Sequence, residues 1–335
     1  MKSLRLLDCT LRDGGHITLG NFGEETIKGV SHKLTLANVD IVELGFVWDR
    51  DYDSNYSRFY NIDRVKRILP SVKTNTKYSI MIEKQNVVQN IEPYDGSIEY
   101  IRVIFKRHLW EWAFETVQRL KDLGYKVFMN PVNCTVYTDD DYLKLIDRIN
   151  EASPYAMSIV DTFGNFRLNS FIDRFKLVDN NLSMDISLGV HLHDNLGLAF
   201  AMAQQALLYA NSDRNIIIDG SLLGMGRDPG NLKIEQMAEY ANHFFGKNYN
   251  LYDIYDAMDD HIYPLLEKYS WGYKLPYAMS SYYDLHRTYA EFLMNQKIST
   301  KDIDIILSKI DRSKAEYYDE QYIDSLYRAF YGLEV

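Results

Sequence analysis

Short apolar stretches alternate with amphipathic stretches along residues 1–245. Each apolar stretch is rich in β-branched residues, and the segments between them are long enough for crossover helices. The expected strands are residues 4–9, 41–46, 78–82, 100–105, 127–132, 157–161, 188–193 and 216–222. Eight such βα units predict an α/β fold of the TIM (β/α)8 barrel type. An open doubly wound sheet is the alternative, because a strand count from sequence is easily wrong by one.

The pattern changes after the last expected strand. Residues 232–245 have the spacing of an amphipathic helix that closes the barrel, and from about residue 249 onward the chain has only helical patterns. Ser299 has the character of an N-cap for a helix that carries Ile303 and Ile306 on one face. We therefore expect a barrel domain at residues 1–248 and an all-helical C-terminal domain at residues 249–335, which covers the barrel mouth or forms a subunit interface.

Composition narrows the class of protein. The 335 residues are 46% hydrophobic and 25% charged, with a formal net charge of −10, which disfavours nucleic acid as a partner. The only cysteines are Cys9 and Cys134, so a disulfide framework or a thiolate zinc site is not expected. Charged residues interrupt the N-terminal segment, and no apolar stretch is long enough to span a membrane. We expect a cytoplasmic protein that acts on small molecules.

Polar residues directly follow several of the expected strands. In a TIM barrel the reactive groups lie at the carboxyl ends of the strands. The segment 8–16 after the first strand contains Asp8, Arg12, Asp13 and His16, with two glycines that permit a sharp turn. Glu43 lies within an apolar run of the second strand, and a buried carboxylate there requires a cationic partner, for which Arg12 is the candidate.

A possible metal site follows the seventh strand. His191 and His193 are two residues apart, so on an extended strand both imidazoles point to the same face. Two histidines with a carboxylate from another strand suit Mn²⁺, Mg²⁺, Co²⁺ or Fe²⁺, and Zn²⁺ less well without a thiolate. The loop at residues 224–231 is glycine-rich and opens a helix, so its backbone N–H groups can bind an anion.

Each of these features alone is equally consistent with a cap, a turn or a structural ion pair. Together they resemble the DRE-TIM metallolyases over about residues 4–245. The resemblance rests on the Thr-Leu-Arg-Asp-Gly motif at residues 10–14, Glu43, the Asp-Thr pair at 161–162, the His-Leu-His-Asp-Asn motif at 191–195 and the glycine-rich loop. The family includes pyruvate aldolases, condensing synthases and a lyase that acts on an acyl-CoA.

The resemblance assigns roles to individual residues. It implies that Asp13, His191 and His193 bind a divalent metal, Mn²⁺ or Mg²⁺ with Co²⁺ and Zn²⁺ as alternatives, and that Asn231 occupies a position that is a ligand in some members. It further implies that Arg12 stabilises an enolate oxygen and that Glu43 holds Arg12. Stabilising negative charge that develops on a carbonyl oxygen is what cleavage of the adjacent carbon–carbon bond requires.

His16 separates branches of the family. Condensing synthases generally have Gly-Glu-Gln after the aspartate, whereas this chain has Gly-Gly-His, which resembles the aldolase branch. There the histidine serves as the general base for the 4-hydroxyl group. The loop at 224–231 lacks the cysteine of the lyase branch. The implied function is an aldolase that converts a 4-hydroxy-2-oxo acid to pyruvate and an aldehyde through an enolate.

Two alternatives remain open. One is a Claisen-type enzyme that condenses an acyl-CoA with a 2-oxo acid, and the other is a barrel that serves only as a binding or scaffold subunit. The aldolase branch also implies an aldehyde dehydrogenase partner bound through the C-terminal domain, with Tyr277 and Tyr289 as candidates for a second-site tyrosine. The tyrosine-rich tail favours a homodimer. A basic turn that contains Arg107 is either a solvated loop or a contact for an anionic group of a longer substrate.

Overall fold

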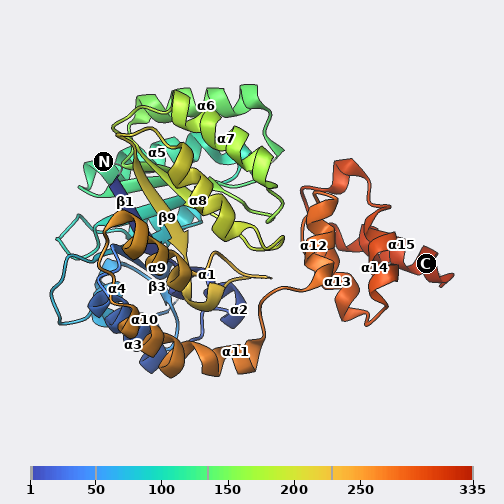
Figure 1. The fold of residues 1–335 in the computed structure, drawn as a ribbon, viewed down its shortest axis with the longest axis horizontal. Coiled ribbons are helices and arrows are strands. Elements are labelled where there is room, and N and C mark those ends of the chain that lie inside the picture. The colour runs from blue at the N-terminus through green and yellow to red at the C-terminus, as the bar shows by residue number, and fades with distance from the viewer. Residues whose placement is uncertain (1–2, 50, 134–135, 228, 334–335) are drawn as a thin grey trace.

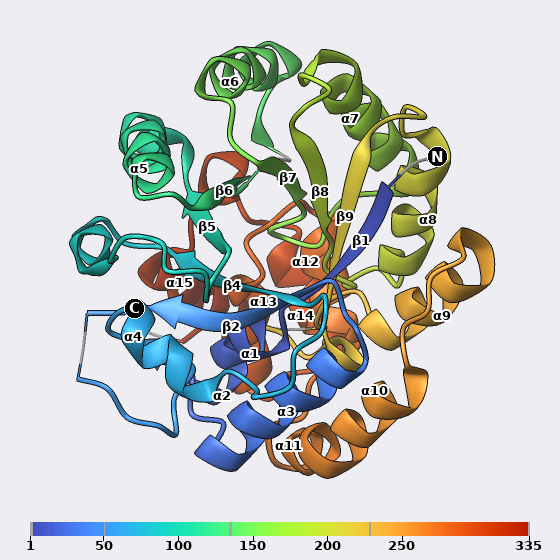
Figure 2. The ribbon, with the colours of Figure 1, turned by 90° about the vertical axis from the view of Figure 1, so that its left-hand side faces the viewer.

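The strands form a closed parallel barrel. The computed structural model describes residues 3–49, 51–133, 136–227 and 229–333. The barrel strands are β1 (Ser3–Asp8), β2 (Ile41–Val47), β4 (Lys77–Ile82), β5 (Tyr100–Phe105), β6 (Lys126–Pro131), β7 (Ala156–Val160), β8 (Ser187–His191) and β9 (Asn215–Gly220). Strand β1 pairs with both β9 and β2, which closes the sheet (Figure 2). The TIM barrel and its eight expected strands are confirmed, and the open sheet is wrong.

Six longer helices surround the barrel: α3 (Glu24–Leu36), α5 (Trp110–Asp122), α6 (Asp139–Ala152), α7 (Leu168–Asn181), α8 (Ala199–Tyr209) and α9 (Ile234–Phe245), among the residues that the structure describes. In the crossover after β2, the described residues form the two-residue strand β3 (Arg58–Phe59), the short α4 (Ile62–Val65) and a 3-10 turn, and the crossover after β4 has a 3-10 helix. The expected closing helix at residues 232–245 is confirmed as α9. After β1 the chain forms two single-turn helices, α1 (Thr10–Asp13) and α2 (Gly15–Thr18).

The remaining helices belong to two hydrophobic cores. Helices α10 (Leu251–Ala257) and α11 (Tyr263–Tyr269) flank a π-helical segment, and Ile254, Ile262 and Trp271 join the core of the barrel. A separate core that begins at Tyr277 holds together α12 (Leu275–Tyr282), α13 (Thr288–Asn295), α14 (Thr300–Leu307) and α15 (Glu320–Tyr331). The expected domain boundary at residues 248–249 stays a prediction. Residues 251–271 pack with the barrel, so the separate helical core begins later, at Tyr277. Below, α12 to α15 are called the helical unit.

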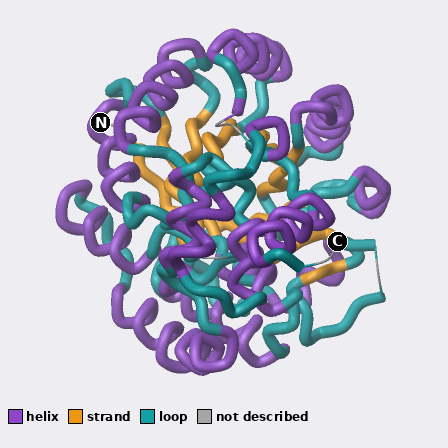
Figure 3. The backbone as a smooth tube through the Cα atoms, turned by 90° about the vertical axis from the view of Figure 1, so that its right-hand side faces the viewer, coloured by secondary structure: helices purple, strands orange, loops and turns teal. Residues whose placement is uncertain are grey.

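The helical unit lies over the carboxyl ends of the barrel strands (Figures 1 and 3). Asn165 donates from Nδ2 to Asp284 Oδ1 over 3.1 Å, and Asn195 donates from Nδ2 to Ser281 Oγ over 3.2 Å. These contacts join loops after β7 and β8 to the helical unit. Ser299 caps α14 by accepting a hydrogen bond from the backbone N–H of Asp302, as its spacing predicts. Within the described part of the chain, no helix is long and apolar enough to cross a membrane.

Candidate active site

Four of the predicted site residues meet at the carboxyl ends of β1 and β8. Asp13, on α1 directly after β1, places its Oδ2 atom 3.2 Å from His191 Nε2 and 3.9 Å from His193 Nε2. Its Oδ1 atom lies 3.8 Å from Nε2 of His16. His191 ends β8 and His193 follows it, so one strand end supplies both imidazoles. The structure thus places three imidazoles around the Asp13 carboxylate at the barrel mouth, with His191 nearer to it than His193 and His16.

Hydrogen bonds orient both imidazoles of the His-x-His pair. His193 Nδ1 lies 2.6 Å from the backbone oxygen of Asp161, and His191 Nδ1 lies 3.1 Å from Asp219 Oδ2. A histidine that binds a metal through one nitrogen usually donates from the other to a carbonyl or a carboxylate. In both rings Nδ1 is occupied by a hydrogen bond, and Nε2 is the nitrogen that faces Asp13. Nε2 is therefore the atom of each histidine that can bind a metal.

Asn231 neighbours His193 through the backbone. The residue forms an isolated β-bridge with His193, and its Nδ2 group donates to Met225 O over 3.1 Å. These contacts leave Oδ1 as a buried acceptor that has no hydrogen-bond donor among the described residues. A buried acceptor without a partner is costly unless another group satisfies it. A bound cation, directly or through its water, would do so.

Cys9 has a sulfur atom close to the candidate metal ligands Asp13 and His191. The Sγ atom of Cys9 and ligand atoms of Asp13 and His191 lie within 4.8 Å of one another. However, the thiol donates to Gly220 O over 3.2 Å, and burial raises its pKa well above the ordinary value. A metal requires the thiolate, which this environment disfavours. The mixed carboxylate, imidazole and amide set therefore fits a divalent cation better than a thiolate site does.

A closed ring of buried charged groups includes the candidate metal ligands Asp13 and His191. Arg12 contacts Asp13 at 3.2 Å and donates from Nε to Glu43 Oε2 over 2.8 Å. Arg102, on β5, donates to the same Glu43 oxygen over 3.1 Å and also to Asp219 at the end of β9, the carboxylate that orients His191. The full order of the ring is Arg12, Glu43, Arg102, Asp219, His191, Asp13.

The ring sets the charge on its members. Burial alone would raise the pKa of Asp13, but Arg12 and His191 hold it well below the ordinary value, so this carboxylate stays ionised. Burial alone would lower the pKa of His191, but hydrogen bonds to Asp13 and Asp219 raise it. Arg102 and Asp219 are not among the site residues that the sequence motifs predict. Two features of the sequence could have indicated them. Arg102 is the charged residue within the apolar run of β5, and Asp219 directly follows three isoleucines on β9.

A cavity of about 420 Å³ opens onto these residues and is referred to below as the reaction pocket. The barrel contributes Arg12, Asp13, His16, Asn130, His191, His193 and Arg227, and the helical unit with the loops that join its helices contributes His286, Arg287, Glu316, Tyr317 and Tyr318. Arg287 donates from Nη1 to Thr162 O over 2.8 Å, which joins the two parts at the pocket wall. The helical unit therefore completes the pocket that the barrel alone would leave open.

His16 faces the reaction pocket and keeps 37% of its side chain exposed. Enclosure by the surrounding protein, together with the guanidinium groups of Arg12, Arg287 and Arg227, lowers its pKa to about 4, although Asp13 acts in the opposite direction. The imidazole is therefore neutral near pH 7. A neutral imidazole with access to a ligand can accept a proton from it.

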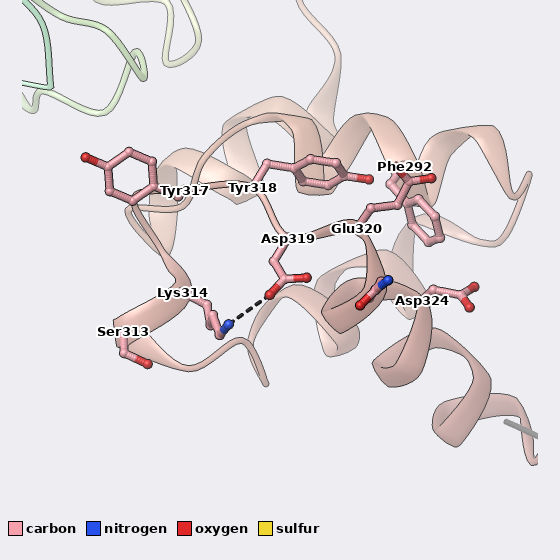
Figure 4. Close-up of a pocket in the computed structure, with 9 residues that line it drawn as sticks. Phe292, Ser313, Lys314, Tyr317, Tyr318, Asp319, Glu320 and Asp324 are labelled. Atoms are coloured by element: carbon pink, nitrogen blue, oxygen red, sulfur yellow. Dashed lines mark hydrogen bonds and ion pairs between the residues drawn. The ribbon is translucent and has the colours of Figure 1, made fainter. Parts of the chain in front are cut away.

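A larger cavity of about 960 Å³ lies within the helical unit, between Lys314 and the start of α15 (Figure 4). Its described charged residues are mostly acidic, and its lysine is paired with Asp319 at 2.8 Å. None of the described histidines or arginines of the barrel lines it. Despite its size, this cavity contains none of the catalytic or metal-binding residues that the sequence predicts.

The structure places other predicted residues away from the reaction pocket. Arg107 pairs with Asp141 at 2.7 Å and is 54% exposed, and it does not line the reaction pocket, whereas Lys106 of the same basic turn does, so a contact of this turn with substrate stays a prediction. Tyr289 is buried in the helical unit, where its hydroxyl donates to backbone oxygens. Tyr277 lines a neighbouring cavity. Cys134, and one position of the glycine-rich loop, Asp228, lie outside the described residues.

The chain is similar to known proteins over most of its length. A family model described as HMGL-like matches residues 3–260. A 2-isopropylmalate synthase from Saccharolobus solfataricus is 25% identical over 241 residues, which cover 70% of this chain and 61% of the synthase, so the chain spans less than two thirds of that relative. A 4-hydroxy-2-oxovalerate aldolase from Geobacillus genomosp. 3 is 22% identical over 273 residues, or 79% of each chain.

A solved structure extends the likeness into the helical unit. The N-terminal domain of a "putative aldolase" from Bacteroides vulgatus is 25% identical, with a TM-score of 0.74, and the match covers 90% of this chain and 99% of that one. The family model covers more than half of the chain and includes the barrel that carries Asp13, His191 and His193. The chain therefore belongs to the HMGL-like family, within the DRE-TIM metallolyases.

Proposed function

We propose that the protein is a divalent-metal-dependent aldolase that cleaves, or forms, a 4-hydroxy-2-oxo acid, with pyruvate and an aldehyde as the other side of the reaction. The observation that carries the proposal is the position of His16. Its neutral imidazole faces the reaction pocket with Nε2 3.8 Å from Asp13 Oδ1, beside the candidate metal ligands. Aldol cleavage requires a base next to a 2-oxo acid held at such a site, and His16 satisfies that requirement.

The reaction assigns a task to each group. A divalent cation held by Asp13, His191 and His193, with Asn231 beside them, would act as a Lewis acid toward the carbonyl oxygen. His16 accepts the proton of the 4-hydroxyl group, the C3–C4 bond breaks, and the bonding electrons pass to the 2-oxo group to give pyruvate enolate and the aldehyde. Arg12, held by Glu43 at 2.8 Å, donates hydrogen bonds to the oxygen on which negative charge develops. Protonation of the enolate at C3 then gives pyruvate.

The alternative is a Claisen-type condensation of an acyl-CoA with a 2-oxo acid, which the likeness to a 2-isopropylmalate synthase supports. One experiment separates the two. The protein is incubated with Mn²⁺ and 4-hydroxy-2-oxovalerate, and pyruvate is followed through lactate dehydrogenase. A parallel reaction with acetyl-CoA and a 2-oxo acid is followed by release of free thiol. Pyruvate formation supports the aldolase, and thiol release without pyruvate formation supports the synthase.

The same preparation tests the remaining proposals. Titration calorimetry with Mn²⁺ and Mg²⁺ measures whether the site binds a cation, and no binding of any divalent ion would favour a scaffold role. We further propose a homodimer and an aldehyde dehydrogenase partner that binds through the helical unit. Light scattering on the purified chain measures the first, and titration of the chain with a purified aldehyde dehydrogenase measures the second.

A further inference from the structure

A second cavity adjoins the reaction pocket. It has a volume of about 580 Å³ and shares His16 and Arg227 with the reaction pocket, so the two cavities meet at these side chains. Its other walls come mainly from the end of α2, from β3, and from the connection between α11 and α12. We call it the side cavity. The side cavity is therefore the neighbouring space that a ligand next to His16 would enter if it extended past His16 and Arg227.

The side cavity is basic, although the chain as a whole has a net charge of −10. Among its described lining residues, Arg58, Arg227 and Lys274 are cationic, and Glu291 is the acidic residue. Arg227 donates to Glu291 over 3.2 Å, so the charges of these two side chains offset each other. The lining as a whole therefore holds more cationic than acidic side chains. A basic wall of this kind selects for anionic ligands.

Several contacts fix the walls of the side cavity. The guanidinium group of Arg58 lies over the ring of Trp48, 4.6 Å from its centroid. A side chain at Gly20 would place its Cβ only 2.9 Å from Arg58 Nε, so the glycine is what lets Arg58 lie against this loop. On the opposite side, Trp271 donates from Nε1 to Leu223 O over 3.0 Å, which ties the α11–α12 connection to the loop after β9. These walls are thus held in place in the free protein.

The direction of the proposed reaction decides which part of a substrate reaches this cavity. The pyruvate half binds at Arg12 and the candidate metal ligands, and the 4-hydroxyl group lies at His16. Atoms beyond C4 leave as the aldehyde, and they extend from His16. We propose that the aldehyde half carries a terminal anionic group, a carboxylate or a phosphate, which Arg58, Arg227 and Lys274 bind in the side cavity. This inference rests on the proposed aldolase function.

The test uses matched pairs of aldehydes with the full chain, Mg²⁺ and pyruvate in the direction of aldol formation. Butanal is compared with succinic semialdehyde, and glyceraldehyde with glyceraldehyde 3-phosphate, so that each pair differs in its anionic group. We expect kcat/KM to be at least about tenfold higher for the anionic member of one pair, which corresponds to about 1.4 kcal/mol. The pair that shows the preference distinguishes a carboxylate from a phosphate. Equal values within both pairs would overturn the inference.

Variants locate the preference. Lys274→Met and Arg58→Gln should each lower the ratio of kcat/KM for the anionic over the neutral aldehyde, and Lys301→Met, at an exposed position on α14, is the control that should keep it. An unchanged ratio in both side-cavity variants would overturn the placement. Exchange of the pyruvate methyl protons with deuterated water, followed by NMR, tests enolate formation without any aldehyde. Exchange without aldehyde discrimination refutes this inference alone, whereas no exchange and no aldol product refute the proposed function.

Discussion

Replacement of Arg102 by methionine tests the buried ring of ion pairs. Arg102 is fully buried and lies between Glu43 and Asp219. Methionine fills much of the same space but leaves both carboxylates without this cation. Breaking a buried ion pair by removing one partner costs roughly 3–5 kcal/mol. That is a large part of the roughly 5–15 kcal/mol by which a folded domain is stable.

The same change should weaken metal binding. Asp219 holds His191 through Nδ1 at 3.1 Å, and Arg102 holds Asp219. Loss of a group that supports a metal ligand usually lowers metal affinity by about 10–100-fold. Because Arg102 acts through Asp219, we expect a loss at the lower end, about tenfold, in calorimetry with Mn²⁺.

Urea unfolding of three variants separates charge from packing. Arg148→Met is the control, since Arg148 pairs with Glu111 at the surface, where an ion pair contributes about 0–1 kcal/mol. The double variant Arg102→Met with Asp219→Asn also removes the Asp219 charge that the single variant leaves buried without Arg102. Its free energy of unfolding should therefore be higher than that of Arg102→Met. If Arg102→Met costs no more than Arg148→Met, or if the double variant is less stable than the single one, the reasoning from buried charge is wrong.

Three further predictions concern the site and its surroundings. His16→Ala should keep Mn²⁺ binding in calorimetry but lower aldol cleavage by about 10²–10⁴-fold, whereas His191→Ala should lose both; full activity of the first variant would exclude His16 as the base. Burial raises the pKa of Asp8 to about 7, above the roughly 3.9 of an unfolded chain, so the stability that this group contributes falls as pH rises between these values. Asp8→Asn should flatten that part of the pH profile in urea unfolding, and an unchanged slope would contradict it. Gly230 has φ of +90°, and a Cβ there would lie 1.9 Å from Gly224 O, so Gly230→Ala should lower the free energy of unfolding by at least about 1–3 kcal/mol, while wild-type stability would contradict the need for glycine.

Local patterns in the sequence were enough to predict much of the barrel. Alternating runs identified all eight strands, because an apolar strand and an amphipathic helix differ in their period over a few residues. The chemistry at single strand ends followed in the same way. His191 and His193 share one face because they are two residues apart, and Arg12, Asp13 and His16 share one short segment.

Only the tertiary structure decided which distant groups meet. Arg102 and Asp219 join Glu43 and His191 because barrel closure and strand register point their side chains into the same interior, and neither is a local property of the chain. The side cavity also depends on the tertiary structure, because its walls come from both the N-terminal and the C-terminal parts of the chain. Likewise, the pairing of Arg107 with Asp141 joins two segments that are separate in the sequence. Sequence spacing determines what a single strand or loop presents, whereas contacts between segments depend on how the whole barrel closes and where the helical unit packs.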